Sequence, residues 1–477
     1  MKLYYWTLFI AITFIGCKKD NTQNSGDYAY LGGEIISPIN KTVYISHANK
    51  VLDTLTLNSK NRFLYKVKNL KPGLYSFKLL SNIGFEFQVV LLEPNDSIML
   101  RLNTLEFDES LVFTGRGAKK NNYLINEFLK NEDEEKKVFK YCQLSPESYQ
   151  KQIDSIKATK LEKLKVFKSK YDTTDLFDKI AELNIEYNYY YNKEIYPFVH
   201  YGHNKNDILE SLPKDFYSYR KHINYNDTFL KDYFVYNSFL VSNFNNMALN
   251  EHYKHTKNDY FKSSNVCYNL DRLALIDSLV TDYEIKEELI HHYTISFLNR
   301  SKNEKNNNTI LNYYTNISSN SEGKEMITRY VSALNNLKTG AKLPEIKLID
   351  VNNSETSANT IINSPTVISF WSQTYYDHFK ESQHKIYELS TKYPEVKFII
   401  INIDNYGLDS ALKALKQNRF SLENQYQFKN PKASKEDLAI YPMTKAFIVD
   451  KNHKIVNSKT NIFARNFEEQ LLGLINR

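Results

Sequence analysis

Residues 367–382 read VISFWSQTYYDHFKES, and the interpretation of the C-terminal part of the chain depends on this stretch. An apolar run that ends in Phe370-Trp371 is followed by a short polar turn and then by a sequence that predicts the start of a helix. Residues 396–403 form a second apolar run, as expected for a strand that is covered on both faces. With the segments around them, these runs predict alternating strands and helices, then a β-hairpin across residues 451–453 and a closing helix.

This order of elements resembles the thioredoxin fold, in the TlpA-like branch that is found in bacterial envelopes. The motifs that carry the resemblance are Gly340–Pro344 with Ile346–Asp350 after it, Phe370-Trp371, and Phe447–Asp450. The resemblance implies an α/β thioredoxin-like domain over residues 339–477.

The family places Cys-x-x-Cys at the helix start, three residues after Phe-Trp, but here the two cysteine positions hold Tyr375 and His378. Disulfide exchange needs an ionised thiol that attacks and a second thiol that resolves the mixed disulfide, which a phenol and an imidazole cannot supply. The family also has a cis-proline six residues before Asp450, where this chain has Thr444. A cis bond there would cost about 2.5–4 kcal/mol, so we expect it to be trans. Pro442 lies two residues earlier and could restore a turn.

These departures predict a redox-inactive thioredoxin-like domain, a pseudoenzyme with no catalytic residue and no cofactor. We expect its cleft to bind a polypeptide or partner protein, because aromatic side chains offer contact area at low entropy cost. The residues expected to line this cleft are Trp371, Tyr375, Tyr376, His378 and Thr444. The alternative for this edge of the domain is simple packing against the helical region.

The start of the chain has the features of an exported lipoprotein. Lys2 precedes a largely apolar stretch, residues 3–15, which is shorter than the ~20 residues that span a bilayer and suits a signal peptide. Phe14–Cys17 resembles the lipobox of bacterial lipoproteins, which implies removal of residues 1–16 and lipidation of Cys17. Residues 17–27 would then be a flexible tether. Lys18 after the cysteine favours attachment to the outer membrane, facing the periplasm or the cell surface, whereas an ordinary signal peptide would leave Cys17 incidental.

Residues 28–115 predict β structure. Short runs rich in β-branched and aromatic residues alternate in polarity and are separated by turn signals, which predicts a small antiparallel sandwich or barrel. The region also resembles the β-rich N-terminal domain of unknown function that precedes a thioredoxin-like domain in many Bacteroidetes lipoproteins. The features that carry this resemblance are Gly33, Val51–Thr54, Pro72–Tyr75, Pro94–Ile98 and Phe113–Gly115, with Asn121–Leu124 after them.

Residues 119–338 predict helices, because apolar residues recur at helical steps and Ser145-Pro146-Glu147 is a typical helix start. The whole chain is therefore expected to be a multidomain α+β protein. Its net charge of +7 is modest for 477 residues, and no basic run is interleaved with aromatics, so we expect no nucleic-acid partner. No segment after the leader is long and apolar enough to cross a membrane.

Two further groups of residues are candidates for functional sites. Cys142 and Cys267 lie in separate helical segments outside any Cys-x-x-Cys motif, which favours two buried free thiols. Residues 251–255 read EHYKH, with two histidines near a carboxylate but no third ligand within sequence reach, so we expect no metal site.

Two functional alternatives remain beside the non-catalytic lipoprotein. The first is a thiol-disulfide oxidoreductase of the TlpA-like family that works through Cys142 and Cys267 or through a partner's cysteines. The second is an accessory lipoprotein of an outer-membrane nutrient-uptake complex, which rests on the lipid anchor and on the high tyrosine content.

Overall fold

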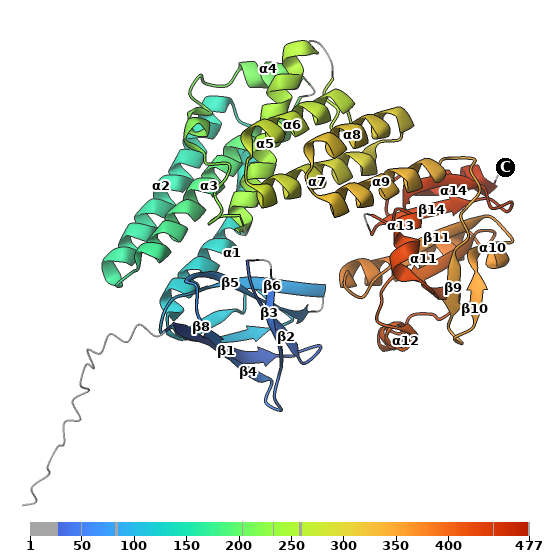
Figure 1. The fold of residues 1–477 in the computed structure, drawn as a ribbon, viewed down its shortest axis with the longest axis horizontal. Helices are drawn as coiled ribbons and strands as arrows, with labels where there is room; N and C mark the ends of the chain where they lie inside the picture. The colour runs from blue at the N-terminus through green and yellow to red at the C-terminus, as the bar shows by residue number, and fades with distance from the viewer. Residues whose placement is uncertain are drawn as a thin grey trace, which may run out of the picture.

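The structure is a computed structural model, and it describes residues 27–48, 50–81, 84–202, 204–231, 233–256, 260–441 and 443–475. The predicted signal peptide, the lipidation site Cys17, almost all of the tether and Pro442 lie outside the described residues. Strands come first, a series of helices arches away from them, and a second part with strands and helices completes the chain (Figure 1). None of the helices in the described ranges has the length and apolar character that crossing a membrane requires.

The N-terminal strands form two four-stranded sheets, with the orders β4-β1-β7-β8 and β3-β2-β5-β6. Buried side chains of both sheets belong to one core, in which Leu31 and Leu100 of the first sheet lie with Ile45 and Phe77 of the second. The two sheets therefore pack face to face. The strands are β1 (Tyr28–Ile36), β2 (Thr42–His47), β3 (Lys50–Thr56), β4 (Arg62–Lys68), β5 (Gly73–Ser81), β6 (Gly84–Leu92), β7 (Ser97–Asn103) and β8 (Val112–Arg116).

One strand pair corrects the expectation of a wholly antiparallel arrangement. Strand β1 pairs with β4 antiparallel, as expected, but with β7 parallel, so that Leu31 is opposite Ile98. The chain crosses to the other sheet between β4 and β7, so no tight hairpin fixes the direction of β7 beside β1. Gly33 allows the close approach of the two strands, because a Cβ there would lie 2.4 Å from the carbonyl oxygen of Leu100.

The described residues from Ala118 to Asn336 form helices and their connections, without a strand. Side-chain caps begin several of these helices: Ser145 Oγ accepts from the backbone N–H of Ser148, and Asp282 accepts from that of Ile285. The helices are α1 (Ala118–Tyr141), α2 (Pro146–Lys170), α3 (Asp175–Val199), α4 (Lys205–Glu210), the 3₁₀ helix η1 (Ser218–His222), α5 (Phe234–His255), α6 (Val266–Leu279), α7 (Tyr283–Arg300), α8 (Glu304–Ile317) and α9 (Ser321–Asn336).

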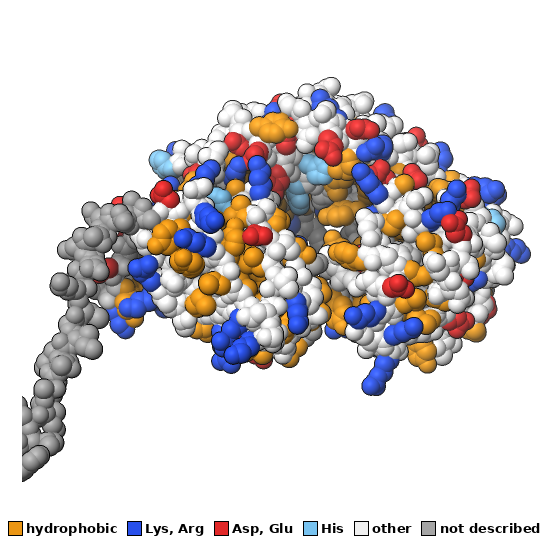
Figure 2. Space-filling model, turned by 60° about the horizontal axis from the view of Figure 1, so that its bottom comes forward, with side chains coloured by type: hydrophobic (Ala, Val, Ile, Leu, Met, Phe, Trp, Pro, Cys, Tyr) orange, Lys and Arg blue, Asp and Glu red, His pale blue; other side chains and the backbone are white. Residues whose placement is uncertain are grey.

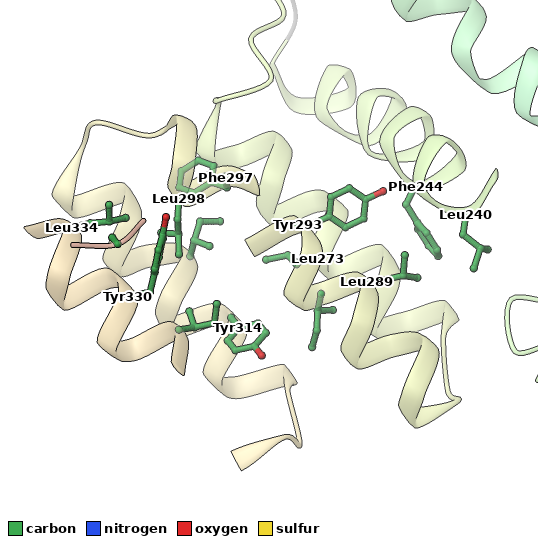
Figure 3. Packing of buried hydrophobic residues seen from close by; sticks show 14 of the residues in the cluster. Leu240, Phe244, Leu273, Leu289, Tyr293, Phe297, Leu298, Tyr314, Tyr330 and Leu334 are labelled. Carbon is green, nitrogen blue, oxygen red and sulfur yellow. The ribbon is translucent and has the colours of Figure 1, made fainter. Parts of the chain in front are cut away.

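A continuous apolar core follows these helices, and large aromatic side chains fill much of it. Figure 3 shows Phe244 of α5, Tyr293 and Phe297 of α7, Tyr314 of α8 and Tyr330 of α9 pointing into the space between the helices. Several of the phenols reach a polar partner; the Tyr293 hydroxyl, for example, donates to the carbonyl of Val241 at 2.6 Å, and the Tyr236 hydroxyl donates to that of Asn224 at 2.7 Å. The tyrosine-rich helices therefore have a structural explanation.

A buried carboxylate ties three of these segments together. Glu194 of α3 is fully buried and forms an ion pair with Arg220 of η1. It also accepts hydrogen bonds from the Tyr219 hydroxyl and from the side-chain amides of Asn243 and Asn246 on α5. The charge is thus held by several donors, as a buried carboxylate requires.

The C-terminal part is built on a seven-stranded sheet with the order β10-β9-β13-β12-β11-β14-β15. Strand β11 is parallel to β12 and antiparallel to β14, and all six of its residues are buried. The elements are β9 (Lys347–Asp350), β10 (Glu355–Ser357), α10 (Ala358–Ile361), β11 (Thr366–Trp371), α11 (Tyr376–Lys392), β12 (Lys397–Asn402), α12 (Leu408–Gln417), β13 (Gln425–Phe428), α13 (Pro431–Asp437), β14 (Lys445–Val449), β15 (Ile455–Asn461) and α14 (Phe467–Ile475).

Specific hydrogen bonds attach this part to the last helices of the arch. Ser458 Oγ donates to the Leu337 carbonyl at 2.5 Å, and the Lys459 ammonium donates to the carbonyls of Leu298 and Ser301 at the end of α7. Seen from below, the surface is hollowed between the β-rich part and the C-terminal part, under the arch of helices (Figure 2).

Candidate functional site

The candidate site lies where the C-terminal ends of β11 and β12 meet the start of α11 and the residues before β14. A cavity of about 650 Å³ opens there. Crossover connections place α11 between the parallel strands β11 and β12, and the antiparallel pair β14 and β15 completes the sheet. This part of the chain has a thioredoxin-like fold.

Comparisons with known proteins find similarity only among solved structures, over about 30% of the chain. No family model matches the chain, and no curated protein matches it. Among solved structures, a candidate thiol-disulfide oxidoreductase from Bacteroides vulgatus matches 29% of this chain over 97% of its own length, with 18% identity and a TM-score of 0.27. The thioredoxin domain of a thiol-disulfide oxidoreductase from Bacteroides vulgatus also covers 29% of the chain and 99% of its own, with 18% identity and a TM-score of 0.25. A thiol:disulfide interchange protein from Bacteroides sp. covers 30% and 93%, with 16% identity and a TM-score of 0.25.

Three of the predicted site residues, Tyr375, His378 and Thr444, line this cavity together. Tyr375 is the residue immediately before α11, and its side chain is 53% exposed. His378, in the first turn of the helix, is half-buried, and burial lowers the pKa of its imidazole, so the ring is neutral at pH 7. The helix start therefore carries a phenol and a neutral imidazole.

The other two predicted cleft residues, Trp371 and Tyr376, do not line the cavity, and this corrects the sequence-based prediction. Trp371 is buried in the core of the fold and stacks on Phe379, with ring centroids 4.4 Å apart, because β11 is a central strand covered on both faces. Tyr376 points to the other side of the helix start, where its hydroxyl donates to Asn418 at 2.8 Å. Both side chains therefore lie on the side of the helix start that faces away from the cavity.

The turn between β11 and α11 is held by a buried carboxylate. Asp404, just after β12, accepts a hydrogen bond from Ser372 Oγ at 2.5 Å and another from the backbone N–H of Gln373 at 2.7 Å. Asn402 donates to the same carboxylate at 3.2 Å. These bonds fix the segment that positions Tyr375, although the turn holds no sulfur.

Two exposed tyrosines that the sequence motifs do not indicate complete the mouth of the cavity. Tyr406 is 57% exposed and Tyr441 is 54% exposed, and both line the cavity with Tyr375. Tyr406 follows the buried strand β12, and Tyr441 lies just before the position where the family has its cis-proline. In open α/β sheets, ligands bind at the edge formed by the strand ends. The positions of these two tyrosines, after β12 and near Thr444, are therefore the sequence signal that could have predicted them as site residues.

The cavity continues toward the helical arch. Lys435, Ile440 and Tyr441 line both this cavity and a second one of about 990 Å³, which lies among α7, α9 and α13. The Tyr330 hydroxyl of α9, which donates to Asn299 Oδ1, also lies 3.3 Å from the Tyr441 carbonyl oxygen, so one rim of the cleft contacts the helical region. The expected alternative, packing of this edge against the helices, therefore describes the rim, while the cleft itself stays open.

A buried lysine supports the same rim from inside. Lys445, the first residue of β14, donates from Nζ to the carbonyls of Leu438 and Ala439 at 3.0 and 2.8 Å. Burial, together with the nearby charge of Lys459, lowers the pKa of Lys445 to about 7. The segment that contains Leu438 and Ala439 is thus held by Lys445, a group that changes charge near neutral pH.

Both cysteines in the described residues are free, and they lie in different parts of the helical region. Cys142 is buried, and burial raises the pKa of its thiol to about 11. Cys267 is half-exposed, which corrects the expectation that both thiols are buried; partial burial and the Asp271 carboxylate raise its pKa as well. Neither thiol is activated as a thiolate, which the disulfide-exchange alternative would need.

Proposed function

We propose that this protein is a non-catalytic lipoprotein of the cell envelope, held to the membrane by a lipid on Cys17, whose thioredoxin-like cleft binds an extended polypeptide. The observation that carries the proposal is the pair Tyr375 and His378 at the start of α11, facing an open cavity beside Thr444. A helix start of this kind still offers its positive dipole end but has no thiolate to stabilise.

The thiol chemistry of the chain supports the absence of redox activity. Apart from Cys17, its cysteines are Cys142 and Cys267, which belong to the helical region. The raised pKa of each thiol leaves little of the reactive anion at neutral pH. The thioredoxin-like part therefore has no thiol of its own for disulfide exchange.

The surface chemistry of the cleft supports a polypeptide as its ligand. Three exposed tyrosines, Tyr375, Tyr406 and Tyr441, surround a cavity large enough for several side chains, and the second cavity extends it along α9. Tyrosine offers a large rigid face with one polar group, which suits varied side chains of an extended segment. The neutral His378 ring and the backbone of the strand ends can pair with peptide amides.

Insulin reduction by dithiothreitol tests the redox part of the proposal. We expect neither the purified protein nor its Cys142→Ser/Cys267→Ser variant to accelerate the reaction. The Tyr375→Cys/His378→Cys variant should form an internal disulfide and gain weak activity, which Thr444 limits. The proposal is wrong if the parent reduces insulin and the variant without Cys142 and Cys267 does not, because that result would assign a disulfide oxidoreductase to the helical region.

Titration with a fluorescently labelled unfolded polypeptide, such as reduced and alkylated insulin B chain, tests the binding part. Replacing Tyr406 and Tyr441 together by Ala should weaken binding by about 10-fold or more, since each truncation removes aromatic contact area. Tyr387→Ala is the matched control, because Tyr387 is 73% exposed on α11 and lies outside the cavity lining. Equal affinities of the cleft variant and the control variant would refute a peptide-binding cleft.

A further inference from the structure

A second cluster of functional side chains lies far from the cleft in sequence, where the end of α5 meets the beginning of α6. His252 and His255 come from α5, and Cys267 and Asp271 come from α6. One ligand atom from each of the four residues can be chosen such that all of them lie within 4.8 Å of one another. The two histidines have no third ligand near them in sequence, and for that reason no metal site is expected from the sequence alone; the third and fourth donors come from the next helix.

The spacing on each helix places both of its donors on one face. His252 and His255 are three residues apart, and Cys267 and Asp271 are four apart, which are the two separations that bring side chains together on a helix. Helices α5 and α6 pack against each other, so the two faces meet. The cluster is therefore a product of helix periodicity and of the pairing of the two helices.

The four side chains lie in contact or close to one another. His255 Nε2 lies 3.1 Å from Asp271 Oδ2, and His255 Nδ1 lies 3.6 Å from Cys267 Sγ. His252 Nδ1 lies 3.8 Å from the same carboxylate oxygen. Donor atoms around a tetrahedral zinc ion are about 3.3–3.8 Å apart, given bond lengths of about 2.0–2.3 Å. The four donors lie within 4.8 Å of one another, so side-chain rotations must bring them closer to reach that geometry, with His255 giving one of its two nitrogens to the metal.

We propose that these four residues form a structural Zn²⁺ site. Two imidazoles, a thiolate and a carboxylate are all zinc ligands, and a full set of four protein donors leaves no position open for a substrate. The thiolate also disfavours Mg²⁺ and Ca²⁺, which prefer oxygen donors. Binding converts the Cys267 thiol to a thiolate, and the proton is released to solvent.

The burial of the donors fits a site that is anchored on one side and open on the other. The His252 side chain is 1% exposed and that of Asp271 20%, whereas that of His255 is 46% exposed. An ion can therefore enter past His255 without unfolding of the helices. The bound ion would cross-link α5 to α6 and so stabilise the folded helical region in proportion to its affinity.

The test uses the full-length chain with Cys17→Ser, so that Cys142 and Cys267 are its only thiols. We expect it to bind one Zn²⁺ per chain, to melt at a higher temperature with Zn²⁺ than with EDTA, and to give the visible bands of tetrahedral Co²⁺ with a thiolate-to-metal charge-transfer band in the ultraviolet. Cys267→Ser should abolish the charge-transfer band although Cys142 is still present. His255→Gln should weaken Zn²⁺ binding by about 100-fold or more.

His384→Gln is the matched control, since His384 is an exposed histidine on α11 away from the cluster. It should bind Zn²⁺ as the parent does. The absence of a Co²⁺–thiolate band in the parent would overturn the proposal without any variant, so a folding defect of a variant cannot hide the answer. Equal Zn²⁺ affinities of the parent and of His255→Gln would also overturn it, because they would indicate adventitious surface binding only.

Discussion

Replacing Lys445 by Met should change how the stability of the thioredoxin-like part depends on pH. Burial lowers the pKa of Lys445 to about 7 in the folded protein, whereas a lysine in the unfolded chain has a pKa of about 10.4. Between these values the unfolded state binds more protons than the folded state, so this group makes the folded state more stable as the pH rises.

The size of the effect follows from the two pKa values. The free energy changes by at most about 1.4 kcal/mol per pH unit for one proton, and less near pH 7, where the folded lysine is itself half protonated. From pH 7 to pH 9 the parent should therefore gain about 2 kcal/mol that the Lys445→Met variant does not gain. The variant also loses the hydrogen bonds to Leu438 and Ala439, at about 1 kcal/mol each, which lowers its stability equally at both pH values.

Trp371 provides a local assay, because the only other tryptophan of the sequence is Trp6 in the predicted signal peptide, which can be replaced by Phe. Urea unfolding followed by Trp371 fluorescence at pH 7, 8 and 9 gives the free energy of unfolding of this part of the chain. Lys454→Met, at an exposed position in the β14–β15 hairpin, should follow the parent. If the parent and Lys445→Met gain stability in parallel from pH 7 to pH 9, then Lys445 is not buried as the structure places it, and the reasoning fails.

Three further outcomes are expected. Glu194→Gln leaves the guanidinium of Arg220 without its buried carboxylate and should cost about 3 kcal/mol in the free energy of unfolding, measured by loss of helical circular dichroism in urea. Gly115→Ala should cost more stability than Gly340→Ala, because both glycines have positive φ but only the first would place a Cβ 2.2 Å from a carbonyl oxygen of β7; equal melting temperatures would contradict this. Cys17→Ala should release the protein from membranes and stop labelling with palmitate, and a variant that is still labelled would exclude Cys17 as the lipid site.

The parts of the fold that local patterns determine could be predicted from the sequence. The ordered motifs around Phe370-Trp371 and Phe447–Asp450 indicated the thioredoxin-like part, because each strand and helix carries its own periodicity. The parallel pairing of β1 with β7 could not be predicted in this way. Whether two strands so far apart in sequence pair parallel or antiparallel depends on how the chain crosses between the sheets. No local sequence pattern determines that crossing.

The candidate site, like the fold, could be predicted from the sequence only in part. Tyr375, His378 and Thr444 were located by counting from recognisable motifs, and the structure places them at one cavity. Trp371 was misplaced because the run from Thr366 to Trp371 is buried on both faces, so an aromatic at its end faces the core. The four donors at the junction of α5 and α6 could not be found, since the sequence shows helical faces but not which of them meet.

Strand β1 also decides how the molecule responds to a mechanical load. It begins at Tyr28, and it is an inner strand, paired over seven residues with β4 on one side and over seven with β7 on the other. A pull on the chain ahead of Tyr28 acts along β1, so both rows of hydrogen bonds share the load in shear and must give way together. An edge strand pulled across its single row would open one bond at a time. The N-terminal sheet is therefore a firm attachment point for whatever force reaches the chain through its first residues.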